Sequence, residues 1–387
     1  MAADRILTTH VGSLIRPPEL VAYLKPLLES RPYDEATFEK CLRSSVADVV
    51  RQQAAIGIDL ISDGEFGKTH WYRYAIERFS GIQSRPVGPG QTYFIGKDRE
   101  RFREFYAEYD KGIPRASLEW AVTSALSYRG AAALRRDIDN FKTALTKVNV
   151  AGGFLPVVAP ASVMPELKNE FYASPEEFAF GIAEALRAEY KAITDAGFIV
   201  QIDDAWLPAM YERLVPPGTP DDYRRWASTC IDALNHALRG IPEHLTRYHI
   251  CWGSWNGPHT ADLPLKEFVD LMLRINVGGY SVEGANPRHE HEWRVWEEVK
   301  LPKGRTLIPG VISHATNIVE HPELVAERIV RLAKLVGREH VIASTDCGFA
   351  QGALYRRVHP SIMWAKLEAL VEGARLASAE LFGRRAA

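Results

Sequence analysis

Four residues at the ends of predicted strands have the chemistry of metal ligands. His249 and Cys251 lie two positions apart in a β-rich run, and Glu283 and Cys347 end two later runs. Residues two apart on a strand point to the same face, so the imidazole and the thiolate can reach one ion. Two thiolates, an imidazole and a carboxylate suit tetrahedral Zn²⁺ better than Mg²⁺ or Ca²⁺. The pattern therefore predicts a zinc site.

The distribution of these ligands favours a catalytic ion over a structural one. Structural zinc more often uses closely spaced CxxC pairs, whereas these ligands come from three separate runs. The alternative is a packed histidine and a buried cysteine, which is the commoner meaning of an isolated HxC pair. Convergence of four compatible ligands favours the metal. The other two cysteines, Cys41 and Cys230, fall in helical patterns and are expected to be inert core residues.

Zinc held by thiolates predicts thiol chemistry. The cation lowers the pKa of a coordinated thiol, so the thiol binds as a thiolate at neutral pH. The bound sulfur can then attack an alkyl carbon, in the way that zinc-bound water attacks in hydrolases. The sequence therefore indicates an enzyme that activates a small thiol for alkyl transfer.

The elements that must position these residues alternate regularly along the chain. Eight β-rich runs cover residues 5–13, 60–65, 155–162, 198–206, 247–253, 279–284, 306–312 and 341–348. Helical periodicity covers residues 33–56, 174–196, 221–239, 264–276, 322–336 and 360–378. Alternating strands and helices predict right-handed βαβ units and a parallel sheet, and eight repeats predict an α/β fold closed as a (β/α)8 TIM barrel. No glycine-rich phosphate loop follows any run, which argues against a nucleotide-binding fold.

Polar residues end nearly every predicted strand. Because reactive groups of such barrels come from the carboxyl ends of strands, we expect them to share one site. The set comprises His10, Gly12, Ser13, Asp63, Glu65, Asp203, Asp204, His249, Cys251, Glu283, Ser313, His314, Asp346 and Cys347.

One connection is much longer than a strand-to-helix link requires. Residues 66–153 form an insertion between strands two and three of a single barrel domain that spans residues 1–387. The insertion carries a PVGPG segment, an amphipathic stretch at 97–111, a β-like run at 121–128 and a helix at 131–145. We expect a lid or a contact between copies of the chain, with a direct contribution to the substrate pocket as the alternative.

Composition narrows the partners to small molecules. The 387 residues are 46% hydrophobic and 25% charged, and the formal net charge is −2. This balance provides no basic field for a nucleic acid or an anionic membrane, so neither partner is expected. No apolar run approaches the roughly 18 residues of a membrane span, and the first residues do not resemble a signal peptide, which predicts a cytoplasmic protein.

Six short segments resemble the cobalamin-independent methionine synthase family, specifically its catalytic C-terminal barrel. They are TTHVGS at 8–13, DGEF at 63–66, QIDD at 201–204, HIC at 249–251, SVEG at 281–284 and TDCG at 345–348. The resemblance covers nearly the whole chain apart from the insertion. Because only one barrel is present, the chain is similar to the short branch of the family, which also includes the epoxyalkane:coenzyme M transferases.

The resemblance implies a role for each matched residue. Gly12 and Ser13 line the homocysteine site, with Ser13 near the amino-acid carboxylate, while Glu65 and Asp203 hold the ammonium. The HIC, SVEG and TDCG segments correspond to those that supply the family's zinc ligands, which gives His249, Cys251, Glu283 and Cys347. A family histidine that assists proton handling follows PGV in strand seven, and here His314 follows PGV one residue early. His314 and Asp203 are therefore the expected catalytic groups.

The resemblance predicts a zinc-dependent methyltransferase that acts on homocysteine, with a methylated folate among the candidate donors. The segment VVAPASV differs from the pattern associated with folate in the long enzymes, so the alkyl donor stays open. The alternative is a transferase or lyase that joins another thiol, such as coenzyme M or glutathione, to an epoxide. Glu65 and Asp203 favour homocysteine because coenzyme M has no ammonium. Glu65 has a structural alternative, as a helix-start acid or a partner of Arg16 or Arg73. A non-catalytic scaffold is disfavoured by the intact ligands.

Overall fold

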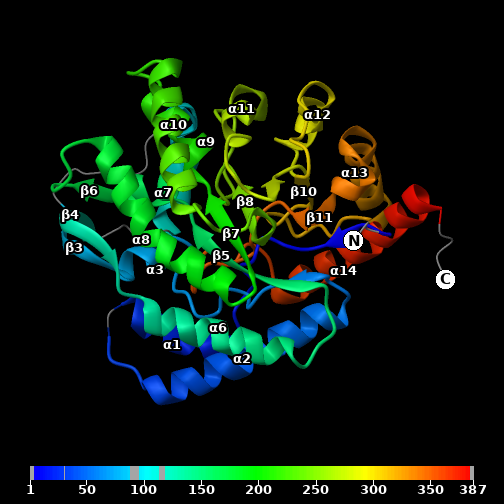
Figure 1. The fold of residues 1–387 in the computed structure, drawn as a ribbon, viewed down its shortest axis with the longest axis horizontal. Helices are drawn as coiled ribbons and strands as arrows, with labels where there is room; N and C mark the ends of the chain where they lie inside the picture. The colour runs from blue at the N-terminus through cyan, green and yellow to red at the C-terminus, as the bar shows by residue number, and fades with distance from the viewer. Residues whose placement is uncertain (1–3, 30, 88–95, 113–117, 384–387) are drawn as a thin grey trace.

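The computed structural model describes residues 4–29, 31–87, 96–112 and 118–383, and its centre is a parallel barrel (Figure 1). Eight strands are hydrogen-bonded in the order β1-β11-β10-β9-β8-β7-β5-β2, with parallel pairing throughout. They are β1 (Leu7–Thr8), β2 (Leu60–Ile61), β5 (Gly152–Val158), β7 (Ile199–Asp204), β8 (Thr246–Ile250), β9 (Gly279–Val282), β10 (Thr306–Ile312) and β11 (Ile342–Thr345). Each predicted run contains or overlaps one of them, so the predicted TIM-like barrel is confirmed.

The seam between β1 and β2 is closed by a backbone hydrogen bond and by side-chain contacts rather than by a regular ladder. The Asp59 amide donates to the carbonyl of Thr8 (3.2 Å), and the Thr9 hydroxyl donates to the carbonyl of Leu60 (2.9 Å). The Asp59 carboxylate accepts from the Thr8 amide (2.9 Å) and from the Arg5 guanidinium. These bonds hold the first and second strands together, so the polar loops that follow them lie side by side.

Helices surround the strands (Figure 1). They are α1 (Pro18–Leu28), α2 (Glu35–Ala55), α3 (Arg73–Glu77), α7 (Pro160–Val163), α8 (Pro175–Asp195), α9 (Trp206–Leu214), α10 (Pro220–Ala237), α11 (Val269–Met272), α12 (Val295–Glu298), α13 (Pro322–Val336) and α14 (Pro360–Phe382). Several begin at capping residues: Asp34, Ser174 and Thr219 each accept a hydrogen bond from an amide of the first turn. The predicted helix at 264–276 is wrong in length, because Phe268, at φ −143°, separates a short 3-10 turn from the four-residue α11.

The insertion between β2 and β5 has its own small sheet. β3 (Phe79–Pro86) pairs antiparallel with β4 (Leu118–Tyr128), and β6 (Leu167–Asn169), which follows β5, pairs parallel with β4. The predicted β-like run lies within β4, and the predicted helix is α6 (Ala131–Leu145), which packs beside α2 (Figure 1). The amphipathic stretch forms α4 (Lys97–Arg101) and α5 (Arg103–Tyr109). Most of the PVGPG segment lies outside the described residues.

A buried arginine occupies the barrel interior below the carboxyl ends of the strands. Arg247 donates to the Gln201 side chain (2.7 Å), to the Thr9 hydroxyl (3.0 Å) and to the carbonyl of His10 (2.9 Å). Its guanidinium lies 3.6 Å from the centroid of the Phe154 ring. Since an unpaired charge is costly to bury, these contacts explain how the barrel accommodates it. Arg247, Gln201, Thr9 and the His10 carbonyl therefore form a polar layer under the barrel mouth, which we call the polar floor.

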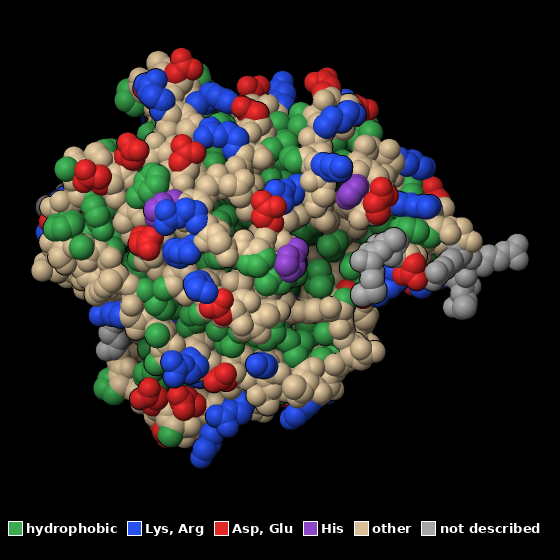
Figure 2. All heavy atoms as spheres, viewed as in Figure 1, with side chains coloured by type: hydrophobic (Ala, Val, Ile, Leu, Met, Phe, Trp, Pro, Cys, Tyr) green, Lys and Arg blue, Asp and Glu red, His purple; other side chains and the backbone are tan. Residues whose placement is uncertain are grey.

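Positive and negative side chains are interspersed over the face of the molecule shown in Figure 2. Among the described residues, none of the helices combines the length and the apolar composition that a membrane span requires.

Candidate metal centre and substrate pocket

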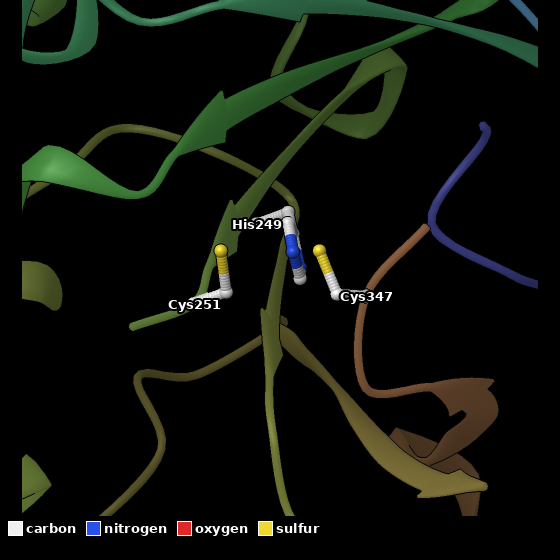
Figure 3. Close-up of side chains that lie close together, drawn as sticks. All are labelled: His249, Cys251 and Cys347. Carbon is white, nitrogen blue, oxygen red and sulfur yellow. The ribbon is translucent and has the colours of Figure 1, made fainter. Parts of the chain in front are cut away.

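Three predicted ligands converge at the carboxyl ends of β8 and β11. His249 lies on β8, Cys251 follows this strand, and Cys347 follows β11. Their ligand atoms all lie within 4.8 Å of one another, and the three side chains point toward a common space (Figure 3). The Ser281 hydroxyl lies 3.1 Å from His249 Nδ1, which leaves Nε2 buried without an oxygen or nitrogen partner among the described residues. This donor set is consistent with a metal site.

The two cysteines form an unequal pair. A hydrogen bond from the Cys251 thiol, together with the neighbouring His249, lowers the pKa of Cys347 well below its usual value despite burial. The same hydrogen bond and burial raise the pKa of Cys251. Ser254, in the loop after β8, donates to Cys347 Sγ (2.8 Å). The protein therefore stabilises one thiolate at Cys347, which is the protonation state a metal ligand needs. The sequence offered no signal for Ser254.

Glu283 follows β9, and its carboxylate is buried near the cysteines. Oε2 accepts a hydrogen bond from Asn286 (2.7 Å), while Oε1 has no hydrogen-bond partner among the described residues. Burial and the nearby Asp346 carboxylate raise the pKa of Glu283, and both cysteine sulfurs lie within its electrostatic reach. Glu283 does not belong to the cluster of three whose ligand atoms lie within 4.8 Å. Its role as fourth ligand stays a prediction.

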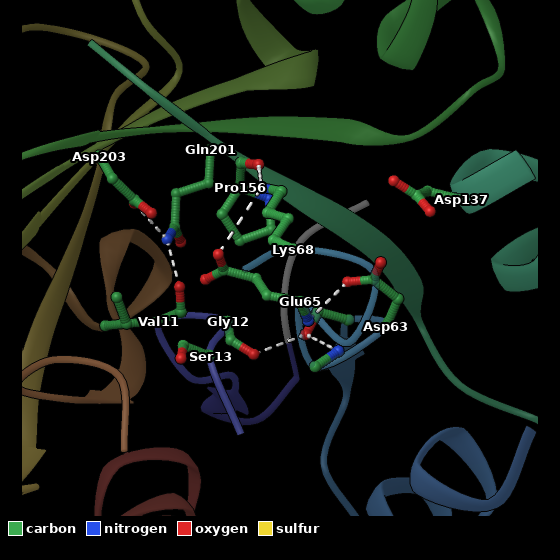
Figure 4. Close-up of polar contacts among 12 residues, drawn as sticks. Val11, Gly12, Ser13, Asp63, Glu65, Lys68, Asp137, Pro156, Gln201 and Asp203 are labelled. Atoms are coloured by element: carbon green, nitrogen blue, oxygen red, sulfur yellow. Dashed lines mark hydrogen bonds and ion pairs between the residues drawn. The ribbon is translucent and has the colours of Figure 1, made fainter. Parts of the chain in front are cut away.

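Glu65, in the loop after β2, and Asp203, at the end of β7, direct their carboxylates toward the same region of the barrel mouth (Figure 4). Glu65 has φ +59°, and its amide donates to Asp63 (2.9 Å), which fixes this strained turn. Its Oε2 lies 3.6 Å from the buried Lys68 ammonium. Asp203 accepts a hydrogen bond from Gln201 (2.7 Å). Gln201 also binds Arg247, so the polar floor orients Asp203.

The two carboxylates of this pocket lie close enough to repel each other. Desolvation and the neighbouring Glu65 raise the pKa of Asp203 well above its usual value. Lys68 lies beside Glu65, and the buried Arg16 and Arg247 also act on the charges of Glu65 and Asp203. A ligand ammonium between the two carboxylates would reduce their repulsion and favour the ionised form of Asp203. The sequence contained Lys68 three positions after Glu65, a spacing that could have identified the pair.

Gly12 and Ser13 form the adjacent wall (Figure 4). Gly12 has φ +122°, and a Cβ at this position would lie 2.3 Å from Pro156 Cγ and 3.3 Å from Glu65 Oε1. Only glycine therefore fits here without displacing the pocket wall. The Ser13 hydroxyl donates to the carbonyl of Ala350 and so ties the loop after β1 to the loop after β11.

The Glu65 carboxylate pairs with neither Arg16 nor Arg73 and lies beside Lys68. Glu65 also does not start a helix, because the next helix, α3, begins at Arg73. Arg16 donates to the backbone carbonyls of Glu65 (2.7 Å) and Lys68 (3.0 Å), not to the carboxylate. Arg73 instead pairs with Glu77 (2.9 Å). Arg16 thus shapes the turn that presents Glu65, and the carboxylate itself faces the mouth.

Not every polar strand end contributes to the mouth. Asp204, the residue after Asp203, accepts a hydrogen bond from Tyr248 (2.8 Å) on the outer side of the barrel. Asp346 accepts from the two backbone amides that follow Glu283 (2.8 Å each). Both carboxylates anchor loops. The expectation of one site shared by all these residues is therefore too broad. Asp204 turns away from Asp203 because neighbouring residues on a strand point to opposite faces, and Asp346, beyond the end of β11, binds the loop after β9.

His314 follows β10 and is buried, with both ring nitrogens lacking a hydrogen-bond partner among the described residues. Burial lowers its pKa to about 4, so the ring is neutral at pH 7. Its segment is fixed by Glu320, which accepts from the Ser313 amide (2.8 Å) and pairs with the fully buried Lys366 (2.8 Å). The loop thus holds a neutral imidazole within electrostatic reach of Cys347.

Known proteins are similar to this chain over nearly its whole length. Methionine synthase from Thermococcus kodakarensis is 25% identical over 379 residues, covering 97% of this chain and 94% of that protein. Methionine synthase from Sulfurisphaera tokodaii is 24% identical over 377 residues, covering 97% and 93%. The chain also shares its fold with a solved B12-independent methionine synthase from Shewanella sp. W3-18-1 in complex with selenomethionine, at TM-score 0.74 and 21% identity, covering 98% of this chain and 100% of that one.

The family model described as "Cobalamin-independent synthase, Catalytic domain" matches residues 167–362, which is just over half of the chain. The matched segment includes β7 to β11 and therefore His249, Cys251, Glu283 and Cys347. The chain belongs to the cobalamin-independent methionine synthase catalytic-domain family.

Proposed function

We propose that this chain is a zinc-dependent methyltransferase that transfers a methyl group to the thiolate of homocysteine. The supporting observation is that one barrel mouth holds both a buried His249, Cys251 and Cys347 cluster and the Glu65 and Asp203 carboxylates. The histidine and cysteine cluster would hold a metal that binds the substrate sulfur, and the two carboxylates would bind an ammonium. Homocysteine carries both groups. The relatives named methionine synthases support the same function.

The donor chemistry fits zinc. His249, Cys251 and Cys347 would hold the ion, with Glu283 as the proposed fourth ligand. When bound, zinc supplies a positive charge that lowers the pKa of a coordinated thiol, so the substrate sulfur is a thiolate at neutral pH. Ser281 orients His249 through Nδ1, and Ser254 donates to Cys347.

The chain's own residues would orient the amino-acid end of the substrate. We assign the ammonium to Glu65 and Asp203, with Lys68 beside Glu65 and Gln201 fixing the Asp203 carboxylate. Gly12 and Ser13 would line the space for the substrate carboxylate. The electrophile would approach the sulfur from the open side of the mouth. We propose a methylated small molecule as the donor, with a methylated folate as one candidate.

His314 is the proposed proton carrier. Both ring nitrogens lack a hydrogen-bond partner among the described residues, so the ring has a free site for the proton that the thiol loses. The negative charge of Cys347 opposes the effect of burial on the pKa of His314 and would favour its protonation. Its neighbours support this role, because Glu320 and Lys366 hold the Ser313 segment in place.

Purified protein should contain about one zinc ion per chain. Cys251→Ser and Cys347→Ser should each lose it, because each change removes one soft ligand. Elemental analysis by mass spectrometry measures the content. Cys230→Ser is the matched control, since Cys230 is buried in α10 outside the cluster and should keep full zinc. Full occupancy in both ligand variants would remove the assignment.

Asp203→Asn should separate homocysteine from coenzyme M. A bound ammonium favours the ionised form of Asp203, and the amide of Asn keeps the shape but cannot carry this charge, so homocysteine affinity should fall by about 1.5–3 kcal/mol, the range of a charged hydrogen bond. Coenzyme M affinity should stay equal or rise, because its sulfonate no longer meets a like charge. Isothermal titration of zinc-loaded wild type and variant measures both thiols. Tight coenzyme M binding by wild type, without homocysteine binding, would favour the epoxide-type transferase instead.

His314→Gln should lower turnover about a hundredfold to ten-thousandfold, the usual contribution of a proton-transfer group. Zinc content and homocysteine affinity should not change, since the side chain is proposed to touch neither the ion nor the ammonium. Single-turnover kinetics with equilibrium binding on the same sample separate the two effects. Unchanged turnover would exclude His314 as proton carrier.

A further inference from the structure

Helices α4 and α5 of the insertion contact the loop after β8 through buried polar groups. This loop, residues 251–264, is called the β8 loop below. Asp98 of α4 is only 5% exposed, and its carboxylate accepts hydrogen bonds from both the amide (2.8 Å) and the hydroxyl of Thr260. A carboxylate buried in this way is held by charge-assisted bonds, which are stronger than neutral ones. The contact joins two segments that are 162 residues apart in the sequence.

A second contact lies five residues earlier in the β8 loop. Trp255 donates from its indole nitrogen to the hydroxyl of Tyr106, which is 4% exposed on α5 (3.2 Å). The half-buried indole packs on two glycines of its own loop: a Cβ on Gly253 would lie 2.2 Å from the ring, and a Cβ on Gly257 would lie 2.0 Å from Nε1. The His259 ring centroid is 4.2 Å from that of Trp255. Trp255 therefore connects Tyr106 of α5 to the backbone of the β8 loop.

The β8 loop carries groups of the metal centre. Cys251 is its first residue, and Ser254, directly before Trp255, donates to Cys347 Sγ. The far end of the loop is held by the barrel itself, through Asp262 and the His289 ring (2.9 Å). Residues 254–260 take two polar contacts from the insertion, in addition to the hydrogen bond that Arg288 donates to the Thr260 carbonyl (3.1 Å).

We propose that α4 and α5 position the two metal-binding cysteines, with Asp98 and Tyr106 as positioning residues that fix the β8 loop. The inference rests on the proposed metal site and assigns the insertion a task there. Asp98 and Tyr106 are buried against the loop, so these two side chains cannot serve a contact between copies of the chain.

The test compares Asp98→Asn and Tyr106→Phe with matched control substitutions on α5. Glu104→Gln makes the same charge change as Asp98→Asn, and Tyr109→Phe makes the same hydroxyl deletion as Tyr106→Phe; Glu104 is exposed and Tyr109 is half-buried. Cobalt(II) replaces zinc as a spectroscopic probe of the cysteine ligands. Chelator competition gives the metal affinity, and amide hydrogen exchange reports on the β8 loop without metal.

The proposal predicts that Asp98→Asn and Tyr106→Phe weaken cobalt binding about tenfold or more, as expected when a supporting partner is lost. The thiolate-to-cobalt absorption band should change, and amides 252–260 should exchange faster, while both controls match wild type. Wild-type affinity, spectrum and exchange in both variants would overturn the proposal.

The experiment distinguishes a failure of the proposed function from a failure of the positioning role alone. A wild type that binds no cobalt would contradict the proposed function and the metal part of this inference together. Normal binding by wild type with unchanged variants would overturn only the positioning role. Thermal unfolding of each variant confirms that the measured protein is folded.

Discussion

The register of three adjacent parallel strands determines the site. Asp203 on β7 lies opposite His249 on β8, and His249 lies opposite Ser281 on β9. These side chains therefore share one layer at the carboxyl ends of the strands, as the pleat requires. Ser281 directs the imidazole, and Cys251, two residues further along, reaches the same space. A shift of one residue would turn the histidine out of the barrel and abolish the cluster.

The polar floor beneath this layer links folding to binding. Arg247 is fully enclosed, and burial lowers its pKa to about 9, so the interior tolerates it only through its bonds to Gln201, Thr9 and the His10 carbonyl. Gln201 also donates a hydrogen bond to Asp203 and so fixes the position of its carboxylate. The same groups thus stabilise the barrel interior and hold the buried Asp203 carboxylate in place.

The sequence predicted the features that depend on local periodicity. Eight runs matched the eight barrel strands, and His249, Cys251 and Cys347 met because strand ends of a parallel barrel share one mouth. The sequence did not predict features that depend on side-chain orientation and on contacts formed in the folded chain. These are the outward orientation of Asp204, the β3–β4–β6 sheet, and the contact of Lys68 with Glu65. For Glu283, the sequence predicted the strand that precedes it. Its distance from the three clustered ligands depends on the conformation of the loop after β9, which residue spacing cannot specify.

The central claim is that this mouth binds an amino thiol as a thiolate, and proton release on binding tests it most directly. Isothermal titration in two buffers of different ionisation enthalpy gives the number of protons released by the zinc-loaded protein at pH 7. Methionine has the same ammonium and carboxylate but no ionisable sulfur. The account predicts that homocysteine releases about one proton more than methionine, because its thiol ionises on binding. Equal proton release by the two ligands would contradict it.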